Sequence, residues 1–590
     1  MAKELTAPKS AEELEEQLGV AFRSGDIGQT AFITWELMNR FPAKVGVARV
    51  YAKKILRDPE IAGLTVDALR SSAKDALKKK QTLEVAQLAA LGLLKYPGDR
   101  NLTLHLLDAS DQLGFLELAE AALKSLGPPK DGDVTHLNAI AGMALKKGDS
   151  ETAYEMFAQL LDLDPENEGL IGNMSGVMVS LERFQEAIDL LENALPKAKE
   201  PLDFVNRLTK IHHLRGHDVK LELAKLDERL FQACDTQSKA RVHANISLFL
   251  EDFPERERGL KEELKFGENK STQFELGEVQ LAQSNFSDGL RNYGVRLEAF
   301  PHLHYCKPLA KPYRGEFLID ESLFIWAEQG IGDELMFSLF FDLIKERVRN
   351  VIVATDFRLI PSLQQRFPTW SFVNRHTLPE EPPATDYACS SGDLFLKFMQ
   401  EISTFEKPFE MPFLLPDQKR LTSIQNILGT KNRPRIGSSW KGGAGVNGII
   451  RSVKLGDMMN ALAEGADIDV ISLQYTENHE QEVISEGDRR VALSGLNNKE
   501  DLEGVFCLMH ECDAIFTVDN AVAHFASFLG VPCFVLIPAA QVQFRWKSEC
   551  MKNLFFPKAH LLRQEMPGDW QATLELGWAR VLDYVGVKDQ

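Results

Sequence analysis

A 34-residue repeat is the feature that most constrains how the first half of this chain can fold. Ala153 and Phe157 recur 34 positions later as Ala187 and Leu191, and Ala119 stands one period earlier. Residues four positions apart lie on the same face of a helix, so each pair predicts a helix whose small residue admits a close neighbour. The spacing therefore predicts successive helix pairs stacked along the chain.

The sequence also shows where these helix pairs end. Pro165 follows Asp164 and ends the second helix of a pair, because proline cannot continue a helix. Looser copies of the pattern cover residues 31–42 and 86–97, whereas residues 200–270 are predicted to be helical without a clean period. The period resembles the tetratricopeptide repeat, whose stacked helices present a concave face to a peptide or protein. A helical bundle without true repeats is the alternative.

Composition and charge exclude several other classes. With 590 residues, the chain is too long for one ordinary hydrophobic core. A net charge of -19 argues against a protein that coats nucleic acid. The seven cysteines, including Cys507 and Cys512, lack metal-binding spacing and are expected to be buried thiols. The polar, acidic N-terminus does not resemble a signal peptide, and no apolar run reaches the ~18 residues of a membrane span, so we expect a cytoplasmic protein.

After about residue 310 the pattern changes to alternating apolar runs and helical stretches. Such alternation predicts parallel sheets covered by helices on both faces. Two series of this kind, divided near residues 416–434, predict two Rossmann-like halves that face a cleft. The clearest βαβ unit is IFTVDNAVAHFASFLGVPCFVLI, residues 515–537. The other predicted strands cover residues 322–327, 350–355, 434–440 and 467–474.

Polar residues follow the predicted strands where each strand ends. Ligands of parallel α/β sheets bind beyond the carboxyl ends of the strands, so these residues are candidates for one site. The glycines of GIGD (330–333) and WKGGAG (440–445) would let backbone approach a ligand. The candidates at the strand ends are Gln329, Gly332, Asp333, Lys441, Arg451, Gln474, Tyr475, Asp519, Asn520, His524, Gln543, Arg545 and Trp546.

Each motif also has a structural interpretation. GIGD can be a tight turn, and WKGGAG a surface loop, since it lacks the spacing of a Walker phosphate loop. Asp519 is expected to cap the helix that follows it, and His524 alone would suit a buried core position. Cys533 is expected to belong to the core. The helix end after Asp519 nevertheless favours an anion, and a diphosphate would fit there.

Together these motifs resemble a known family. The stretches LFIWAEQGIGDELMFSLF, RIGSSWKGG, RSVKL, VISLQ and CDAIFTVDNAVAHFASFLGVPCFVLIP, followed by FRW, are similar to bacterial tetratricopeptide-linked glycosyltransferases. Their catalytic part is similar to heptosyltransferases of glycosyltransferase family 9 and, more distantly, to protein O-GlcNAc transferases. The junction NFSDGLRNYGVRLE resembles the last repeat before the enzyme in that family. The resemblance covers roughly residues 275–570 and implies a GT-B fold.

The resemblance implies roles for individual residues. Asp333 is the candidate base for the acceptor hydroxyl, and His524 is the second candidate catalytic residue. No metal and no cofactor is expected besides the nucleotide-sugar donor. The residues implied in donor binding are Gly332, Lys441, Arg451, Gln474, Asp519, Asn520, Ala521 and His524.

The sequence departs from the family pattern in three places. Asn520 replaces a threonine and can still donate a hydrogen bond. The loop 442–450 lacks a histidine and an aspartate that many relatives carry, which leaves the identity of the donor open. Gln543 stands where an aspartate usually precedes the Arg-Trp pair.

The predicted organisation has three domains. Residues 1–300 form a helical repeat domain, residues 301–425 an acceptor-side Rossmann-like domain, and residues 426–590 a domain that binds the nucleotide sugar. The predicted activity is inverting, metal-independent transfer of a sugar to a protein recruited by the repeats. Related repeat-bearing enzymes act on flagellin, which makes flagellin a candidate acceptor. The alternatives are a transferase of lipopolysaccharide or surface-saccharide assembly, and a repeat scaffold with an inactive transferase domain.

Overall fold

The computed structural model describes the chain from residue 10 to residue 587 with short gaps, and it contains two compact units, Met1–Leu181 and Glu182–Gln590. The residues outside the description are 1–9, 80, 114, 131, 200, 216–221, 223–235, 304–305, 307, 379–381, 403–408, 444–445, 464, 476–479, 481–482, 485–490, 540–542, 567 and 588–590.

The described part of the first unit is helical. Many of its helices begin after an Asp, Asn, Ser or Thr whose side chain accepts a hydrogen bond from a backbone amide of the first turn. At α10, the Asp149 side chain accepts such a bond from the Thr152 amide. The elements are α1 (Ala11–Ser24), α2 (Ile27–Arg40), η2 (Pro42–Lys44), α3 (Val45–Leu56), α4 (Pro59–Ala62), α5 (Val66–Lys78), α6 (Thr82–Lys95), α7 (Arg100–Gln112), α8 (Leu116–Ser125), α9 (Val134–Lys147), α10 (Ser150–Leu163) and α11 (Glu168–Ser180).

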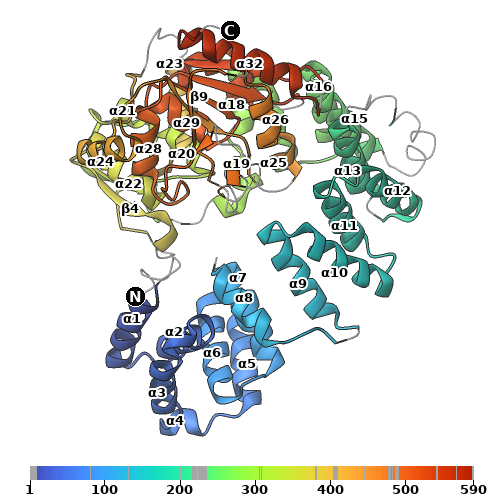
Figure 1. Ribbon diagram of the computed structural model, residues 1–590, viewed down its shortest axis with the longest axis vertical. Helices are drawn as coiled ribbons and strands as arrows, with labels where there is room; N and C mark the ends of the chain where they lie inside the picture. Colours follow the sequence, from blue (N-terminus) through green and yellow to red (C-terminus); the bar gives the residue numbers. More distant parts are fainter. Residues whose placement is uncertain are drawn as a thin grey trace. The chain divides into compact units, whose positions relative to one another are not determined.

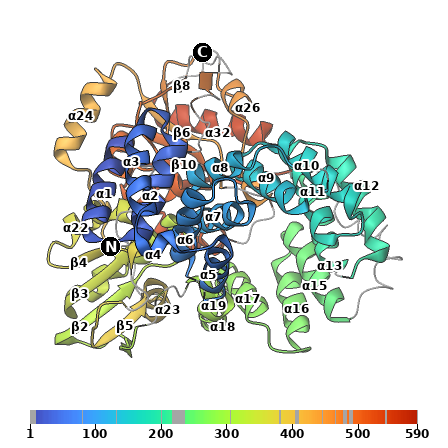
Figure 2. The same cartoon turned by 90° about the horizontal axis from the view of Figure 1, so that it is seen from below.

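The helices of the first unit pack as the repeat pattern predicts. α2 packs against α6, α6 against α7, and α7 against α8 (Figure 2). Ala153 and Phe157 are buried on α10, and α10 ends at Leu163, one residue before Asp164-Pro165. The predicted helix pairs and the predicted helix end are both confirmed.

The second unit begins with further helices. They are α12 (Phe184–Ala194), η3 (Leu195–Lys197), α13 (Pro201–Leu214), α15 (Thr236–Phe249), α16 (Phe253–Leu264), α17 (Lys270–Ala282), α18 (Phe286–Tyr293), α19 (Arg296–Ala299) and η4 (Pro301–Leu303). α17 and α18 cross closely, because a Cβ atom on Gly277 would lie 2.4 Å from the backbone nitrogen of Tyr293. α18 packs against α23, a helix of the first sheet, and α17 packs against α30, a helix of the second sheet. α17 and α18 therefore contact both halves of the unit.

The first sheet is parallel and has the strand order β1-β5-β2-β3-β4. Its strands are β1 (Lys311–Pro312), β2 (Leu318–Trp326), β3 (Val348–Thr355), β4 (Ser371–Asn374) and β5 (Tyr387–Ser390). The helices of this half are α20 (Ile331–Ser338), α21 (Phe341–Ile344), η5 (Phe357–Leu359), α22 (Ile360–Arg366), η6 (Arg375–Thr377) and α23 (Ser391–Ile402). The strands predicted at 322–327 and 350–355 are confirmed as parts of β2 and β3. β1, β4 and β5 were not predicted.

The second sheet is also parallel, with the strand order β11-β10-β9-β6-β7-β8. Its strands are β6 (Arg435–Ser439), β7 (Asp469–Ser472), β8 (Val491–Ala492), β9 (Ala514–Val518), β10 (Cys533–Ile537) and β11 (Ala559–Arg563). Its helices are α24 (Gln418–Leu428), α25 (Val446–Ile450), α26 (Leu455–Asn460), α28 (Leu502–His510), α29 (Ala521–Phe528), α30 (Phe544–Lys547), α31 (Glu549–Phe555) and α32 (Gln571–Tyr584). The predicted βαβ unit is confirmed as β9, α29 and β10.

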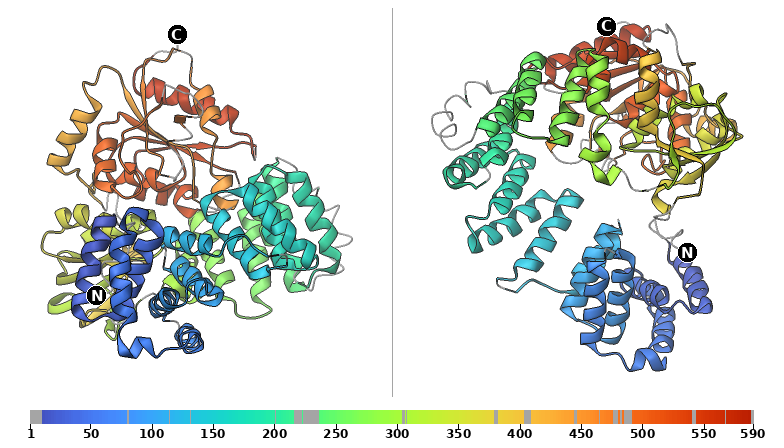
Figure 3. Two further views of the ribbon diagram at one scale, coloured as in Figure 1. Left: turned by 60° about the horizontal axis from the view of Figure 1, so that its bottom comes forward. Right: turned by 180° about the vertical axis from the view of Figure 1, so that it is seen from behind.

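The two sheets belong to one compact unit. α20 of the first half packs against α29 of the second (Figure 1), and one hydrophobic cluster includes buried side chains of both halves, such as Phe337 and Phe528. The C-terminal helix α32, dark red in Figure 3, packs on β9, β10 and β11. The predicted fold class is confirmed: helical repeats precede two Rossmann-like halves in the GT-B manner.

The cysteines agree with the sequence in part. Cys507, Cys512 and Cys533 are buried thiols, as predicted, whereas Cys550 on α31 is exposed. The expectation of buried thiols is therefore wrong for Cys550. Among the described residues, none of the helices combines the length and the apolar character that crossing a membrane requires.

Candidate functional site

The second sheet has a topological switch point between β6 and β9, because the strands run outward in chain order on either side of this pair. Ligands of open parallel sheets bind beyond the carboxyl ends of the strands at such a point. Lys441 follows β6 there, and Asp519 and Asn520 follow β9. Arg451 joins them, since its Nη1 donates to the Asp519 carbonyl oxygen over 3.4 Å. The structure thus brings four of the predicted residues to one place.

Asn520, and not Asp519, caps α29. The Asn520 side chain accepts a hydrogen bond from the Val522 amide over 3.0 Å. Its Nδ2 donates to Ser439 Oγ over 2.8 Å and to the Lys441 carbonyl oxygen over 3.0 Å. The expectation that Asp519 caps the helix is therefore wrong. The backbone of Asn520 is extended, so the helix begins at Ala521. The Asn520 side chain joins four partners, since its Oδ1 also accepts from Thr517 Oγ1 over 3.3 Å.

Asp519 points elsewhere. Its side chain is 2% exposed, and its Oδ1 accepts a hydrogen bond of 2.8 Å from the indole Nε1 of Trp546. Its Oδ2 is buried without a hydrogen-bond partner. A buried carboxylate with one unsatisfied oxygen is costly. Asp519 thus connects the β9 turn with α30.

Gln474, after β7, holds the two strand ends together. Its Oε1 accepts from Ser439 Oγ over 3.0 Å and from the amides of Trp440 and Lys441, each over 2.9 Å. The side chain is fully buried. These hydrogen bonds show that Gln474 holds the backbone at Lys441 in place. A direct contact between Gln474 and a nucleotide stays a prediction.

The first amides of α29 already have partners. The Val522 amide donates to Asn520 Oδ1, and the Ala523 amide donates to the Asn520 carbonyl oxygen over 3.2 Å. The sequence predicts that free amides after Asp519 hold a diphosphate. In the structure the amides of Val522 and Ala523 are held by Asn520, so the half-buried cations Lys441 and Arg451 are the more accessible phosphate partners.

His524 lies where the two halves meet. Its Nδ1 is 2.9 Å from the Gly332 carbonyl oxygen and donates to it, because a carbonyl can only accept. A Cβ atom on Gly332 would lie 3.0 Å from the imidazole ring, so only glycine allows this approach without displacement. Burial, together with the charge of Arg545, lowers the pKa of His524 to about 3. His524 is thus neutral at neutral pH and offers a diphosphate no positive charge.

Asp333 forms an ion pair with Arg545 of α30. Asp333 lies in the first turn of α20, and its role as a cap of this helix stays a prediction. Burial raises the pKa of Asp333, but the Arg545 guanidinium and the other polar neighbours together bring this pKa below its usual range. Asp333 is therefore a permanent carboxylate, fixed by a cation from the opposite half.

Helices before the first sheet supply residues that the sequence analysis missed. Tyr293 of α18 accepts a hydrogen bond of 2.9 Å from Gln329 Nε2, and its ring meets Phe544 edge-on at 5.7 Å. Gln329 itself has a φ of 63°, a left-handed conformation that is uncommon for a residue with a side chain. The only sequence signal for Tyr293 was the junction motif that contains it. That Tyr293 faces the site depends on the tertiary fold.

The switch point of the first sheet is filled by the protein itself. It lies between β2 and β5, and Arg296 of α19 occupies it. Arg296 Nε and Nη2 donate to the two carboxylate oxygens of Glu328 over 2.8 and 2.6 Å, and both side chains are 0% exposed. Ser390 Oγ and Asp393 Oδ1 also accept from Nη2, over 2.7 and 2.9 Å.

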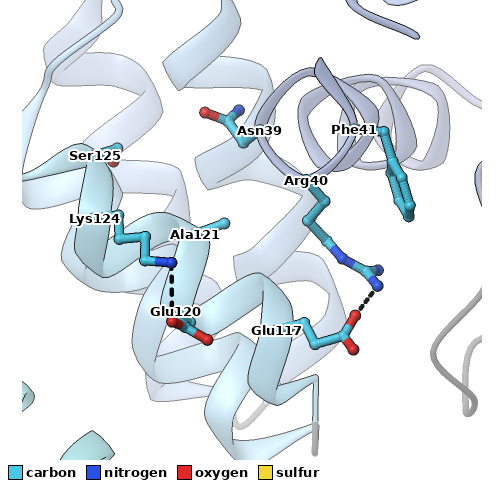
Figure 4. Close-up of a pocket in the computed structure, with 8 residues that line it drawn as sticks. All are labelled: Asn39, Arg40, Phe41, Glu117, Glu120, Ala121, Lys124 and Ser125. Carbon is cyan, nitrogen blue, oxygen red and sulfur yellow. Dashed lines mark ion pairs between the residues drawn. The ribbon is translucent and has the colours of Figure 1, made fainter. Parts of the chain in front are cut away.

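Two cavities are lined by described residues of the chain. One of about 420 Å³ borders Glu328 and Gln329 and is lined by the cationic or titratable side chains of His302, Arg375 and His376. The other, of about 520 Å³, lies in the first unit between the end of α2 and α8 (Figure 4). The described residues contain no group of three or more His, Cys, Asp or Glu side chains placed to hold a metal ion.

Comparisons with known proteins find repeat proteins and transferases. The family described as "Tetratricopeptide repeat" matches residues 144–203. Protein FlbA of Caulobacter vibrioides is 23% identical over 555 residues, which span 86% of this chain and 91% of FlbA.

Two solved structures represent the transferases that the sequence resembles. The ADP-heptose LPS heptosyltransferase II of E. coli is 14% identical, with 45% of this chain and 97% of that chain covered and a TM-score of 0.30. A mutant O-GlcNAc transferase of Thermobaculum terrenum is 9% identical, with 78% of this chain and 93% of that chain covered and a TM-score of 0.27.

Proposed function

We propose that this chain is an inverting glycosyltransferase that moves a sugar from a nucleotide donor to a hydroxyl group of a protein acceptor in the cytoplasm. The observation that supports it most is the arrangement of charges at the strand ends. Lys441 and Arg451 stand at the switch point of the second sheet, and the Asp333 carboxylate faces the second half through Arg545. Cations on one side and a carboxylate on the other suit the two demands of glycosyl transfer.

The chemistry requires both charges. As the acceptor oxygen attacks the anomeric carbon, the bond to the diphosphate breaks and its electron pair leaves with the diphosphate. Cations at fixed positions stabilise the negative charge that develops there, and this is usually the largest single contribution to catalysis. A carboxylate takes the proton of the acceptor hydroxyl. We assign the first task to Lys441 and Arg451 and the second to Asp333.

A nucleoside diphosphate should bind to the full chain without a divalent metal. Replacing Arg451 with glutamine should weaken binding roughly 10-fold or more, because a charged hydrogen bond contributes about 1.5–3 kcal/mol. Calorimetry with UDP, GDP, ADP and TDP, each with and without chelator, measures this. The matched control is Lys454→Gln. It removes one positive charge three residues further on, where Lys454 is exposed and pairs with Glu182. Binding that needs a metal, or that responds equally to both variants, would contradict the proposal.

The first unit is proposed to recruit the protein acceptor, for which flagellin is one candidate. Stacked helix pairs commonly bind peptides or proteins. The cavity of about 520 Å³ combines charged side chains of both signs with Asn39 and Phe41 (Figure 4). Arg40 forms an ion pair with Glu117 there, and Lys124 Nζ lies 3.0 Å from Glu120 Oε1. Such a surface suits a polar peptide segment.

Reversing the charge of Lys124 should impair transfer to the protein acceptor and leave donor hydrolysis unchanged. We expect Lys124→Glu to raise KM for the acceptor roughly several-fold, because a charge at the rim of an interface mainly affects association. The control is Lys78→Glu on α5, another exposed lysine with an acidic partner on its own helix. The acceptor is first identified by mass spectrometry of cellular proteins with and without this chain. An equal KM for wild type and both variants would exclude this surface.

A further inference from the structure

Three turns of the second unit have a backbone conformation that is uncommon for a residue with a side chain. Glu182, Glu251 and Ser284 each stand two residues before a helix, α12, α16 and α18, and have φ angles of 58°, 55° and 62°. At the same position before α2 and α10, the first unit has Gly25 and Gly148. Because this left-handed conformation is costly for most residues other than glycine, we expect each of the three side chains to make a contact that glycine could not make.

Two of these side chains contact the end of α30. Lys547 Nζ donates to Glu251 Oε1 over 2.6 Å. Ser284 Oγ lies 2.9 Å from the Oγ atom of Ser548, the next residue along the chain. α17, which precedes Ser284, also packs against α30. The turns before α16 and α18 therefore hold the end of this short helix.

The ion pair between Glu251 and Lys547 differs from a pair on the surface. The Lys547 side chain is 9% exposed, and its Nζ lies 5.4 Å from the centroid of the Phe253 ring. By contrast, the Lys454 side chain that pairs with Glu182 is 67% exposed. Exposed pairs contribute little to stability, whereas a buried charge that loses its partner is strongly destabilised. Loss of the Glu251 carboxylate would therefore loosen the end of α30.

α30 also carries contacts that reach the proposed catalytic centre. Arg545 forms the ion pair with Asp333 of the first half, and Trp546 Nε1 donates to Asp519 Oδ1 over 2.8 Å. Both side chains directly precede Lys547 in a helix of four residues. A displacement of its last residue therefore displaces the groups that hold both carboxylates.

We propose that Glu251 and Lys547 are positioning residues of the transferase centre: their ion pair fixes α30, and α30 in turn holds the two carboxylates of the centre. This role rests on the proposed function. A misplacement of about 1 Å far from the reacting atoms can slow a reaction ~100-fold, so loosening α30 is expected to slow the chemical step. The helices before the first sheet thus contribute to the catalytic centre itself.

The first test measures donor hydrolysis by the full chain, with a panel of UDP-, GDP-, ADP- and TDP-linked hexoses as the probe and water as the acceptor. Glu251→Gln should lower kcat about 10-fold and change the donor KM less than about 2-fold, because Lys441 and Arg451, which are proposed to hold the diphosphate, lie outside α30. The control is Glu262→Gln, which removes the charge of an exposed glutamate of α16 that pairs with Lys265, and it should change neither constant. An unchanged kcat, or a loss confined to KM, would overturn the inference.

Charge reversal tests whether the ion pair itself is responsible. Lys547→Glu places a second carboxylate against Glu251 and should lower kcat at least as much as Glu251→Gln does. Adding Glu251→Lys recreates a pair of opposite charges, so the double variant should recover part of the lost kcat. A double variant as slow as Lys547→Glu alone would contradict the role of the pair.

The last test needs no activity. Fluorine NMR of the full chain labelled with fluorotryptophan reports on Trp546, whose resonance is assigned by its absence from Trp546→Phe. Glu251→Gln should shift or broaden this resonance, because the indole that donates to Asp519 moves with α30, and Glu262→Gln should leave it unchanged. If the Trp546 resonance is the same in wild type and Glu251→Gln, the inference is wrong. If no donor is hydrolysed but the resonance responds to Glu251→Gln, the proposed function fails and the coupling through α30 stands.

Discussion

Replacing Asp333 with asparagine is expected to slow sugar transfer by roughly 10²–10⁴-fold, the contribution of a positioned proton acceptor, while the chain remains folded. Asparagine keeps the size of the side chain and an oxygen that can cap a helix, so the start of α20 should be preserved. It loses the charge and the basicity. Arg545 keeps the Gln543 oxygen as a partner of its Nε, at 3.0 Å, which limits the loss of stability.

The control for Asp333→Asn is another Asp–Arg ion pair, which lies wholly within the first half. Asp342 pairs with Arg366, and the two side chains are about as buried as Asp333 and Arg545. Asp342→Asn should cost stability without slowing transfer. Turnover and unfolding are measured for wild type and both variants. If Asp333→Asn kept full activity, the proton acceptor would be another group of the cleft. If it lost both fold and activity, Asp333 would be a helix cap and ion-pair partner only.

Replacing Arg296 with methionine is expected to lower the free energy of unfolding by roughly 3–5 kcal/mol, because removal of one partner leaves the other charge buried and uncompensated. Glu328 is 0% exposed, and the Gly392 amide, which donates over 3.0 Å, would be its main remaining donor. Denaturant unfolding of the full chain measures the change.

The double variant Arg296→Met with Glu328→Gln separates charge from packing. It removes both charges of the buried pair, and apolar or neutral replacements of a whole buried pair are often nearly neutral in stability. The double variant should therefore be more stable than Arg296→Met alone. If the free energy of unfolding of Arg296→Met differed from that of wild type by less than about 1 kcal/mol, the pair would not hold α19 on the first sheet.

The same reasoning predicts that a chain begun near residue 310 would fold poorly, because it lacks Arg296 and Tyr293.

The local sequence determined the repeat helices and most central strands of both sheets, though not β5 or the strands at the sheet edges. Periodicity depends on neighbours within one helix or strand, so the 34-residue spacing of Ala153 and Ala187 predicted the helix pairs. The apolar run before Asp519 and the run after Pro532 likewise predicted β9 and β10. Polar residues after strand ends meet in any parallel sheet, so the grouping of Lys441 with Asn520 was also predictable.

Only the tertiary structure decided which side chain takes which partner. The choice of Asn520 over Asp519 as the helix cap depends on Ser439 and Trp546, which are distant in sequence. The pairing of Asp333 with Arg545 crosses from one sheet to the other. Arg296 fills the first switch point and Tyr293 contacts Phe544 of the second half only because α17–α19 fold back onto both sheets. Such contacts arise from the packing of whole elements, and no local pattern of residues encodes them.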